Sequence, residues 1–152
     1  MKNILFVCTG NTCRSCMAEA IFNKKCDIDN LTAISAGIAV LSNSKTSKNS
    51  TIVTKENTGI NLSDRNSVQL TKNMLENSEL VLTMTTYIRD ILGAKFPEFK
   101  HKIYTLNEYI SMENDIVDPF GGDVEIYRNT YRQLENSIVL LLNKLKEDIG
   151  IV

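Results

Sequence analysis

Residues 4–15 read Ile4-Leu5-Phe6-Val7-Cys8-Thr9-Gly10-Asn11-Thr12-Cys13-Arg14-Ser15. The first four residues form a short, continuous apolar run, which is typical of a strand buried on both faces of a parallel sheet. Gly10 and Asn11 tolerate left-handed backbone angles, so the chain can turn sharply after the strand. A helix is expected to begin near Cys13 or Arg14, because apolar residues recur at helical spacing over the next two turns.

Strands and helices alternate along the rest of the chain. The expected strands are residues 4–7, 31–34, 80–82 and 103–106, and the expected later helices are residues 48–57, 71–77, 87–92 and 127–145. Residues 41–50 are rich in Ser, Asn and Lys and are expected to form an exposed loop. The alternation implies right-handed crossovers, and therefore an α/β protein of three-layer α/β/α type around a four-stranded parallel sheet. Residues 1–152 show no repeat or linker and are predicted to form a single domain.

Composition and charge exclude several classes of protein. The chain has 152 residues, with 17 Lys and Arg against 18 Asp and Glu, a net charge of -1 and a pI of about 5.9. Such a chain lacks the basic surface of a general nucleic-acid binder or a polybasic membrane binder. The sequence contains no run of about 18 apolar residues, the length needed to span a bilayer. Residues 1–7 do not resemble a signal peptide. We therefore expect a cytoplasmic, monomeric protein without nucleic-acid or membrane partners.

The four cysteines of the chain are Cys8, Cys13, Cys16 and Cys26. A secreted disulfide framework would spread its cysteines to join distant segments. Structural zinc needs about four ligands, but Cys13 and Cys16 have no second pair downstream, and His101 stands alone in a strand-like stretch. No metal or other cofactor is expected. The cysteines instead favour chemistry at a single thiol.

The loop at residues 8–15 has the features of a phosphate-binding site. Ligands of open parallel sheets bind beyond the carboxyl ends of the strands, where this loop is expected to lie. Its backbone N–H groups can curl inward at the positive end of a helix and hold an anion. Arg14 presents a planar fork that binds two phosphoryl oxygens at once. The predicted phosphate-binding residues of the loop are Thr9, Gly10, Asn11, Thr12, Cys13, Arg14 and Ser15.

Cys8 is the candidate nucleophile of this loop. The amide donors, the helix end and Arg14 favour its thiolate form, and Ser15 can donate a hydrogen bond to the sulfur. A thiolate in a phosphate cradle attacks phosphorus and forms a phosphocysteine, which water then hydrolyses. The alternative for Cys8 is a buried, inert thiol at the end of a strand.

The leaving group of such a reaction needs a proton. Asp118, in Asp118-Pro119-Phe120-Gly121-Gly122, is the most eligible acid. Pro119 fixes the direction of the backbone beside the carboxyl group, and the two glycines permit a tight turn over a pocket. Taken alone, Asp-Pro indicates only a turn.

Residues 8–15, together with Ser35-Ala36-Gly37 and Asp118-Pro119, resemble the low-molecular-weight protein tyrosine phosphatases. The resemblance covers essentially the whole chain, including the order of the expected strands and helices. It implies a protein phosphatase in which Cys8 is the nucleophile and Arg14 binds phosphate. Asp118 would be the general acid and, in the second step, the general base.

The same resemblance implies supporting functions for several neighbours of the nucleophile. Asn11 would hold the loop in shape with support from Ser35, and Ser15 would stabilise the thiolate. Cys13 would trap the oxidised nucleophile as a disulfide. Cys16 departs from the family pattern, because many relatives have Pro at this position, and it adds a third nearby thiol.

Within the family, the sequence is most similar to the bacterial protein-arginine phosphatases, on residues 8–15, 81–85 and 118–122. Tyrosine-specific relatives usually have a bulkier aliphatic residue in place of Thr12. A phenyl ring favours apolar walls on both faces, but Phe120 is the one obvious wall here, and residues 41–50 contain no aromatic side chain. A phosphoguanidinium is planar and rich in N–H donors, which suits the hydroxyl of Thr12. Phosphoarginine in proteins is therefore the preferred substrate, and phosphotyrosine is the alternative.

Two other functions would use the same loop. Thioredoxin-coupled arsenate reductases share the fold, but they need further redox cysteines after the third strand, and residues 81–91 contain none. A non-catalytic module that binds phosphoproteins would need the cradle but would have no use for Asp118 or a thiolate. Turnover of a phosphorylated peptide separates the enzyme from the module.

Overall fold

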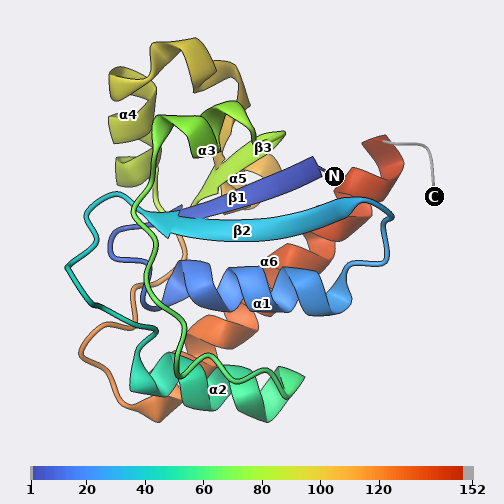
Figure 1. Ribbon diagram of the computed structural model, residues 1–152. Coiled ribbons are helices and arrows are strands. Elements are labelled where there is room, and N and C mark those ends of the chain that lie inside the picture. The colour runs from blue at the N-terminus through green and yellow to red at the C-terminus, as the bar shows by residue number, and fades with distance from the viewer. Residues whose placement is uncertain (1, 149–152) are drawn as a thin grey trace.

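The computed structural model describes residues 2–148 and places a parallel sheet between two layers of helices (Figure 1). Its strands are β1 (Lys2–Cys8), β2 (Leu31–Gly37), β3 (Leu80–Thr83) and β4 (Ile103–Thr105), in the spatial order β2-β1-β3-β4. The helices are α1 (Arg14–Lys25), α2 (Lys48–Thr58), α3 (Lys72–Glu76), α4 (Thr86–Lys95), the 3-10 helix η1 (Pro97–Lys102), α5 (Leu106–Tyr109) and α6 (Val124–Asp148). The three-layer α/β/α fold with a four-stranded parallel sheet is confirmed.

Alternate residues of β1 point to opposite faces of the sheet, and each face has its own core. Ile4, Phe6 and Cys8 belong to the core that includes residues of α1 and α6. Leu5 and Val7 belong to the core that includes residues of α3 and α4. Figure 1 shows α1, α2 and α6 on one side of the sheet and α3 and α4 on the other. The apolar run of β1 is therefore covered on both faces, and its last residue, Cys8, faces the α1 side.

Several strand boundaries differ from the expectation, and the first strand already begins at Lys2. The second strand continues past residue 34 to Gly37, because its last residues pair with β1 as far as Cys8. The fourth strand ends at Thr105. Its hydroxyl accepts from the backbone N–H of Glu108, and its own backbone N–H donates to the Glu108 carboxylate, which together form a capping box that starts α5. His101 was expected in a strand-like stretch and this was wrong: it lies in η1, where an initial proline has its φ already set for a helix.

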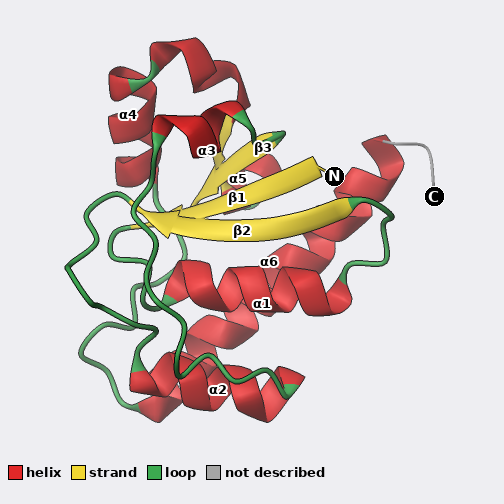
Figure 2. Ribbon diagram, in the orientation of Figure 1, coloured by secondary structure: helices red, strands yellow, loops and turns green. Residues whose placement is uncertain are grey.

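The helices predicted from apolar periodicity are present, with changed ends. The last helix begins three residues before the expected Tyr127 and buries Tyr131, Leu134 and Ile138 against the core. Figure 2 shows loops gathered at the arrowhead ends of β1 and β2, where the loop of residues 8–15 lies. Within residues 2–148, no helix combines the length and the apolar character needed to cross a membrane.

Candidate active site

The loop that follows β1 lies directly against the end of β2. Gly37 is the register partner of Cys8, and the N–H of Ala39 donates to the carbonyl of Thr9 at 2.9 Å. A Cβ atom at position 37 would lie 2.6 Å from the Thr9 carbonyl oxygen and 2.8 Å from the backbone nitrogen of Asn11. Asn11 itself has a φ of 56°, in the left-handed region. The approach of the loop to β2 therefore requires glycine at position 37, and the turn of the loop requires the conformational tolerance of Asn11.

The sulfur of Cys8 is surrounded by hydrogen-bonding groups at the start of α1. Its Sγ atom lies 2.8 Å from the hydroxyl of Ser15, and the backbone N–H of Asn11 donates to it at 3.3 Å. The side chain is buried among the loop, β1 and the α1 side of the core. The N–H of Asn11 donates to the sulfur, and the Ser15 hydroxyl is within hydrogen-bonding distance of it.

Arg14 and Asp118 converge on the same pocket from distant parts of the chain. Arg14 is the buried first residue of α1, and its Nη1 atom donates to the carbonyl of Ile116 at 3.1 Å. Its Nη2 atom lies 3.6 Å from Asp118 Oδ2, longer than a direct hydrogen bond. The Asp118 side chain is 59% exposed, and its Oδ1 atom accepts from the backbone N–H of Phe120. The carboxyl group is therefore held at the mouth of the pocket, and the loose pairing leaves Arg14 able to bind an anion.

A pocket of about 460 Å³ opens above the loop. Its lining includes Cys8 and Thr12 from the loop, together with the apolar side chains of Phe120 and Leu41. Phe120 is 82% exposed and Leu41 is 79% exposed, an unfavourable state for two large apolar side chains in water. A turn places Leu41 there, since the N–H of Ser44 donates back to its carbonyl at 3.2 Å. The sequence indicated Phe120 as a wall but missed Leu41, whose only signal was an apolar residue in an otherwise polar loop.

A second layer of polar side chains supports the loop from below. Asn11 donates from its Nδ2 atom to the hydroxyls of Ser15 at 2.8 Å and Ser35 at 3.0 Å. Arg65 donates to Asn11 Oδ1 at 2.9 Å and to the Ser35 hydroxyl at 2.8 Å, and it pairs with Glu19 at 3.4 Å. Asn11, Ser15 and Ser35 were expected from the sequence to support the loop, whereas Arg65 and Glu19 were not. No local pattern marks these two, because Arg65 contacts the loop from 54 positions away and Glu19 contacts Ser35 and Arg65, 16 and 46 positions away.

Comparison with known proteins connects this geometry to a protein family. Residues 3–150 match the family model described as low molecular weight phosphotyrosine protein phosphatase. The chain belongs to this family. It is 41% identical over 146 residues to a protein-arginine-phosphatase of Geobacillus stearothermophilus, covering 95% of this chain and 97% of that protein. It is 37% identical over 143 residues to the low molecular weight protein-tyrosine-phosphatase PtpB of Staphylococcus haemolyticus, covering 94% and 96%.

A solved structure of a family member carries information about the chemistry of that protein. It is the YwlE arginine phosphatase with serine in place of the active-site cysteine, and that serine is phosphorylated. The chain described in Figure 1 resembles that YwlE structure with a TM-score of 0.90 and 36% identity, and the match covers 99% of both chains.

Cys13 lies in the wall of the phosphatase pocket. Its Sγ atom is 3.5 Å from the hydroxyl of Ser47 and 3.4 Å from that of Tyr127. Burial is the main cause, and the contact with Cys13 the second, of a rise in the pKa of Tyr127 to about 12. The phenol is therefore neutral at physiological pH and can hydrogen-bond to the Cys13 sulfur.

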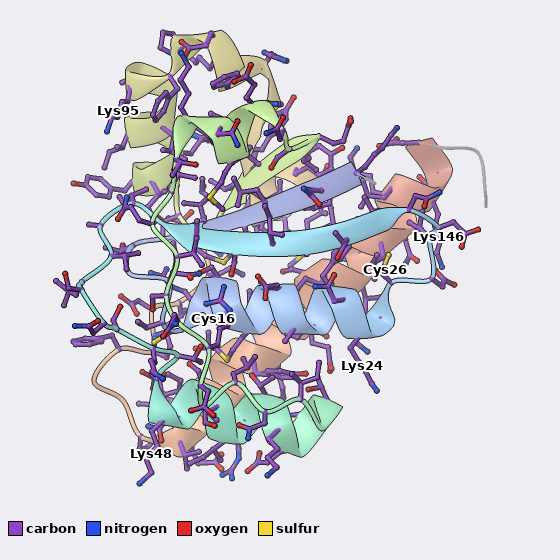
Figure 3. The ribbon with its side chains drawn as sticks, in the orientation of Figure 1. Cys16, Lys24, Cys26, Lys48, Lys95 and Lys146 are labelled. Atoms are coloured by element: carbon purple, nitrogen blue, oxygen red, sulfur yellow. The ribbon has the colours of Figure 1, made fainter. Side chains whose placement is uncertain are left out.

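Cys16 lies beneath the loop, at the end of α1 that is opposite Cys26 (Figure 3). Its S–H donates to the carbonyl of Asn11 at 3.0 Å. Burial raises the pKa of the Cys16 thiol to about 12, although the nearby Arg65 acts in the opposite direction. This third thiol of the phosphatase therefore stays protonated at neutral pH and is a poor nucleophile.

Proposed function

We propose that this phosphatase removes phosphoryl groups from protein side chains through a phosphocysteine on Cys8, with phosphoarginine as the preferred substrate. One observation carries the proposal: the Cys8 sulfur, the Arg14 guanidinium and the Asp118 carboxyl group all line the same pocket. The match to the phosphatase family supports the reaction class.

The proposed reaction has two steps at phosphorus. The phosphoryl oxygens bind to the N–H groups of the loop and to Arg14, which neutralise charge as it develops. The Cys8 thiolate attacks phosphorus, the bond from phosphorus to the leaving nitrogen or oxygen breaks, and Asp118 donates its proton to that leaving atom. Water then attacks the phosphocysteine, Asp118 takes the proton of that water, and the P–S bond breaks. Inorganic phosphate leaves, and Cys8 is again a thiolate.

The walls of the pocket support phosphoarginine as the substrate. Phe120 offers one aromatic face to a flat group, and the aliphatic Leu41 lines the same pocket. Thr12 lines the same pocket with a small side chain that bears a hydroxyl, a partner for a guanidinium N–H. The 41% identical relative is named a protein-arginine-phosphatase, whereas the 37% identical relative is named a protein-tyrosine-phosphatase. Phosphotyrosine is therefore the second candidate substrate.

The proposal includes the setting in which the enzyme acts. Residues 1–152 would form one domain that acts as a monomer on cytoplasmic phosphoproteins, without a cofactor. The thiols of Cys8, Cys13, Cys16 and Cys26 are free, which fits a reducing compartment.

The deciding experiment compares kcat/KM for phosphoarginine and phosphotyrosine peptides on one preparation. We expect turnover of both and a higher value for phosphoarginine. Cys8→Ser should abolish turnover and retain binding of inorganic phosphate, because much of the cradle is backbone. Cys26→Ser is the matched control, since Cys26 lies at the far end of α1, and it should keep full activity. Mass spectrometry of rapidly quenched wild-type enzyme should find the phosphoryl group on Cys8; finding it on another residue would refute the mechanism.

A further inference from the structure

Arg65 lies outside the pocket, yet its guanidinium is the centre of the polar network beneath the nucleophile. It precedes α3 in a segment without regular structure, and 16% of its side chain is exposed. Nη1 donates to Asn11 Oδ1, and Nη2 donates to the hydroxyl of Ser35. The carboxylate of Glu19, 3.4 Å away, balances its charge. Arg65 does not line the pocket, and most of its side chain is covered by these partners, so its effect on the site must pass through them.

The contacts of Arg65 determine which way round the Asn11 amide lies. An amide has an accepting oxygen and a donating nitrogen, and its orientation follows from its partners. Asn11 Oδ1 accepts from Arg65 and from the backbone N–H of Val68, both at 2.9 Å. Both partners can only donate. Reversing the fully buried amide would place three donors against one another, which is costly because buried donors would be left without acceptors.

The orientation of Asn11 in turn determines what the Ser15 hydroxyl can do. With Oδ1 towards Arg65, Nδ2 donates to Ser15 Oγ at 2.8 Å. That oxygen is then an acceptor towards Asn11, and its own hydrogen remains for Cys8 Sγ, 2.8 Å away. In the reversed amide, the oxygen of Asn11 would compete for the Ser15 hydrogen. The sulfur would then lose a donor.

We propose that Arg65 is a positioning residue that sets the direction of the hydrogen-bond chain from Arg65 through Asn11 and Ser15 to Cys8. An all-donor side chain at its start makes every link donate towards the sulfur, and so stabilises the thiolate. The inference rests on the proposed function in one respect, that Cys8 is the nucleophile. A second series of hydrogen bonds also begins at Arg65: its guanidinium donates to the Ser35 hydroxyl, which in turn donates to Glu19 Oε1 at 3.0 Å.

A double-mutant cycle between Arg65 and Ser15 tests this inference. Arg65→Met keeps the length of the stem and removes the donors, and we expect it to lower kcat/KM for an aryl phosphate about 10- to 100-fold, the effect of one hydrogen bond to a charged group. In the Ser15→Ala background, Arg65→Met should lower kcat/KM less than about threefold, because the hydrogen bond from Ser15 to the sulfur is already missing. Arg132→Met is the control, since Arg132 is exposed on α6 and bonds only to Asn129 among the described residues, and it should match wild type.

Alkylation of Cys8 by iodoacetamide provides a readout that needs no substrate. The titratable and charged groups around Cys8 are Cys13, Arg14 and Asp118 in the pocket, and Cys16, Glu19 and Arg65 beneath the loop. The pH midpoint of alkylation should move to higher pH in Arg65→Met. In Arg65→Lys it should move less, because the charge remains but a single ammonium cannot reproduce the fork.

The outcomes separate this inference from the proposed function. If the wild type hydrolyses no phosphopeptide but Arg65→Met shifts alkylation, the function fails and the positioning stands. The positioning is refuted if Arg65→Met keeps wild-type kcat/KM and alkylation, or if its loss is the same with and without Ser15. If thermal unfolding shows that Arg65→Met does not fold, the cycle is run with Arg65→Lys, and an equal loss in both backgrounds refutes the positioning there too.

Discussion

Replacing Gly37 with alanine should disable the enzyme while leaving most of the fold in place. The new Cβ would meet three backbone atoms of the loop: the Thr9 carbonyl oxygen at 2.6 Å, the Asn11 nitrogen at 2.8 Å and the Gly10 carbonyl carbon at 2.9 Å. Ordinary contact begins at 3.4 Å, so the nearest atom is 0.8 Å too close. Because all three are backbone atoms, no side chain can turn aside, and the loop itself must move.

The size of the effect follows from that displacement. A misplacement of about 1 Å at a reacting centre costs on the order of 100-fold in rate. Overpacking a well-packed site costs about 1–3 kcal/mol of stability. We therefore expect Gly37→Ala to lower kcat/KM for an aryl phosphate by roughly 30- to 100-fold and to weaken inhibition by inorganic phosphate. The melting temperature should fall by several degrees, since about 1 kcal/mol corresponds to a few degrees in a domain of this size.

Gly93→Ala is the matched control. Its Cβ would meet only the side chain of Lys100, at 3.7 Å, and it lies within α4. It should keep full activity and gain about 0.5–1 kcal/mol of stability, because alanine favours a helix over glycine. If Gly37→Ala retained activity within twofold of wild type, the close approach of loop and strand would not control the geometry of the site.

Three further predictions concern the acid, the substrate and the redox response. Asp118→Asn should slow phosphoryl transfer from poor leaving groups most and from activated aryl phosphates least, as pre-steady-state kinetics can measure; equal slowing for all would assign Asp118 a structural function. Thr12→Ile should lower kcat/KM for phosphoarginine relative to phosphotyrosine by about 10- to 100-fold, because unpaired N–H donors cost about 1–3 kcal/mol; an unchanged ratio would remove Thr12 as the determinant of selectivity. Peroxide should inactivate the wild type reversibly through a disulfide between Cys8 and Cys13. Cys13→Ser should make that loss irreversible to thiol reductants, whereas Cys16→Ser should not, since the buried Cys16 thiol has its pKa raised to about 12; recovery of the Cys13→Ser variant would contradict this.

Much of the fold follows from patterns that span only a few residues. Three signals depend only on residues that are close together in the sequence: the apolar run of β1, the conformational tolerance of Gly10 and Asn11, and the helical spacing after Arg14. Backbone sterics and side-chain periodicity operate at that range, so strand, loop and helix could be predicted in order. Asp118 could also be proposed, because the chemistry of the loop calls for an acid and its Asp-Pro-Phe-Gly-Gly setting favours an exposed turn.

Other parts of the site depend on contacts between segments far apart in the chain. The need for glycine at Gly37 comes from the backbone of a loop more than 20 residues away. Arg65 reaches Asn11 across 54 positions, and Leu41 and Phe120 line the same pocket although they are far apart in the sequence. Any surface arginine or loop leucine would look the same in a linear sequence. Local energetics specify which conformation a segment prefers, but only the packing of segments against each other determines which side chains meet, and in this protein that packing sets the shape of the pocket and the orientation of the hydrogen bonds beneath Cys8.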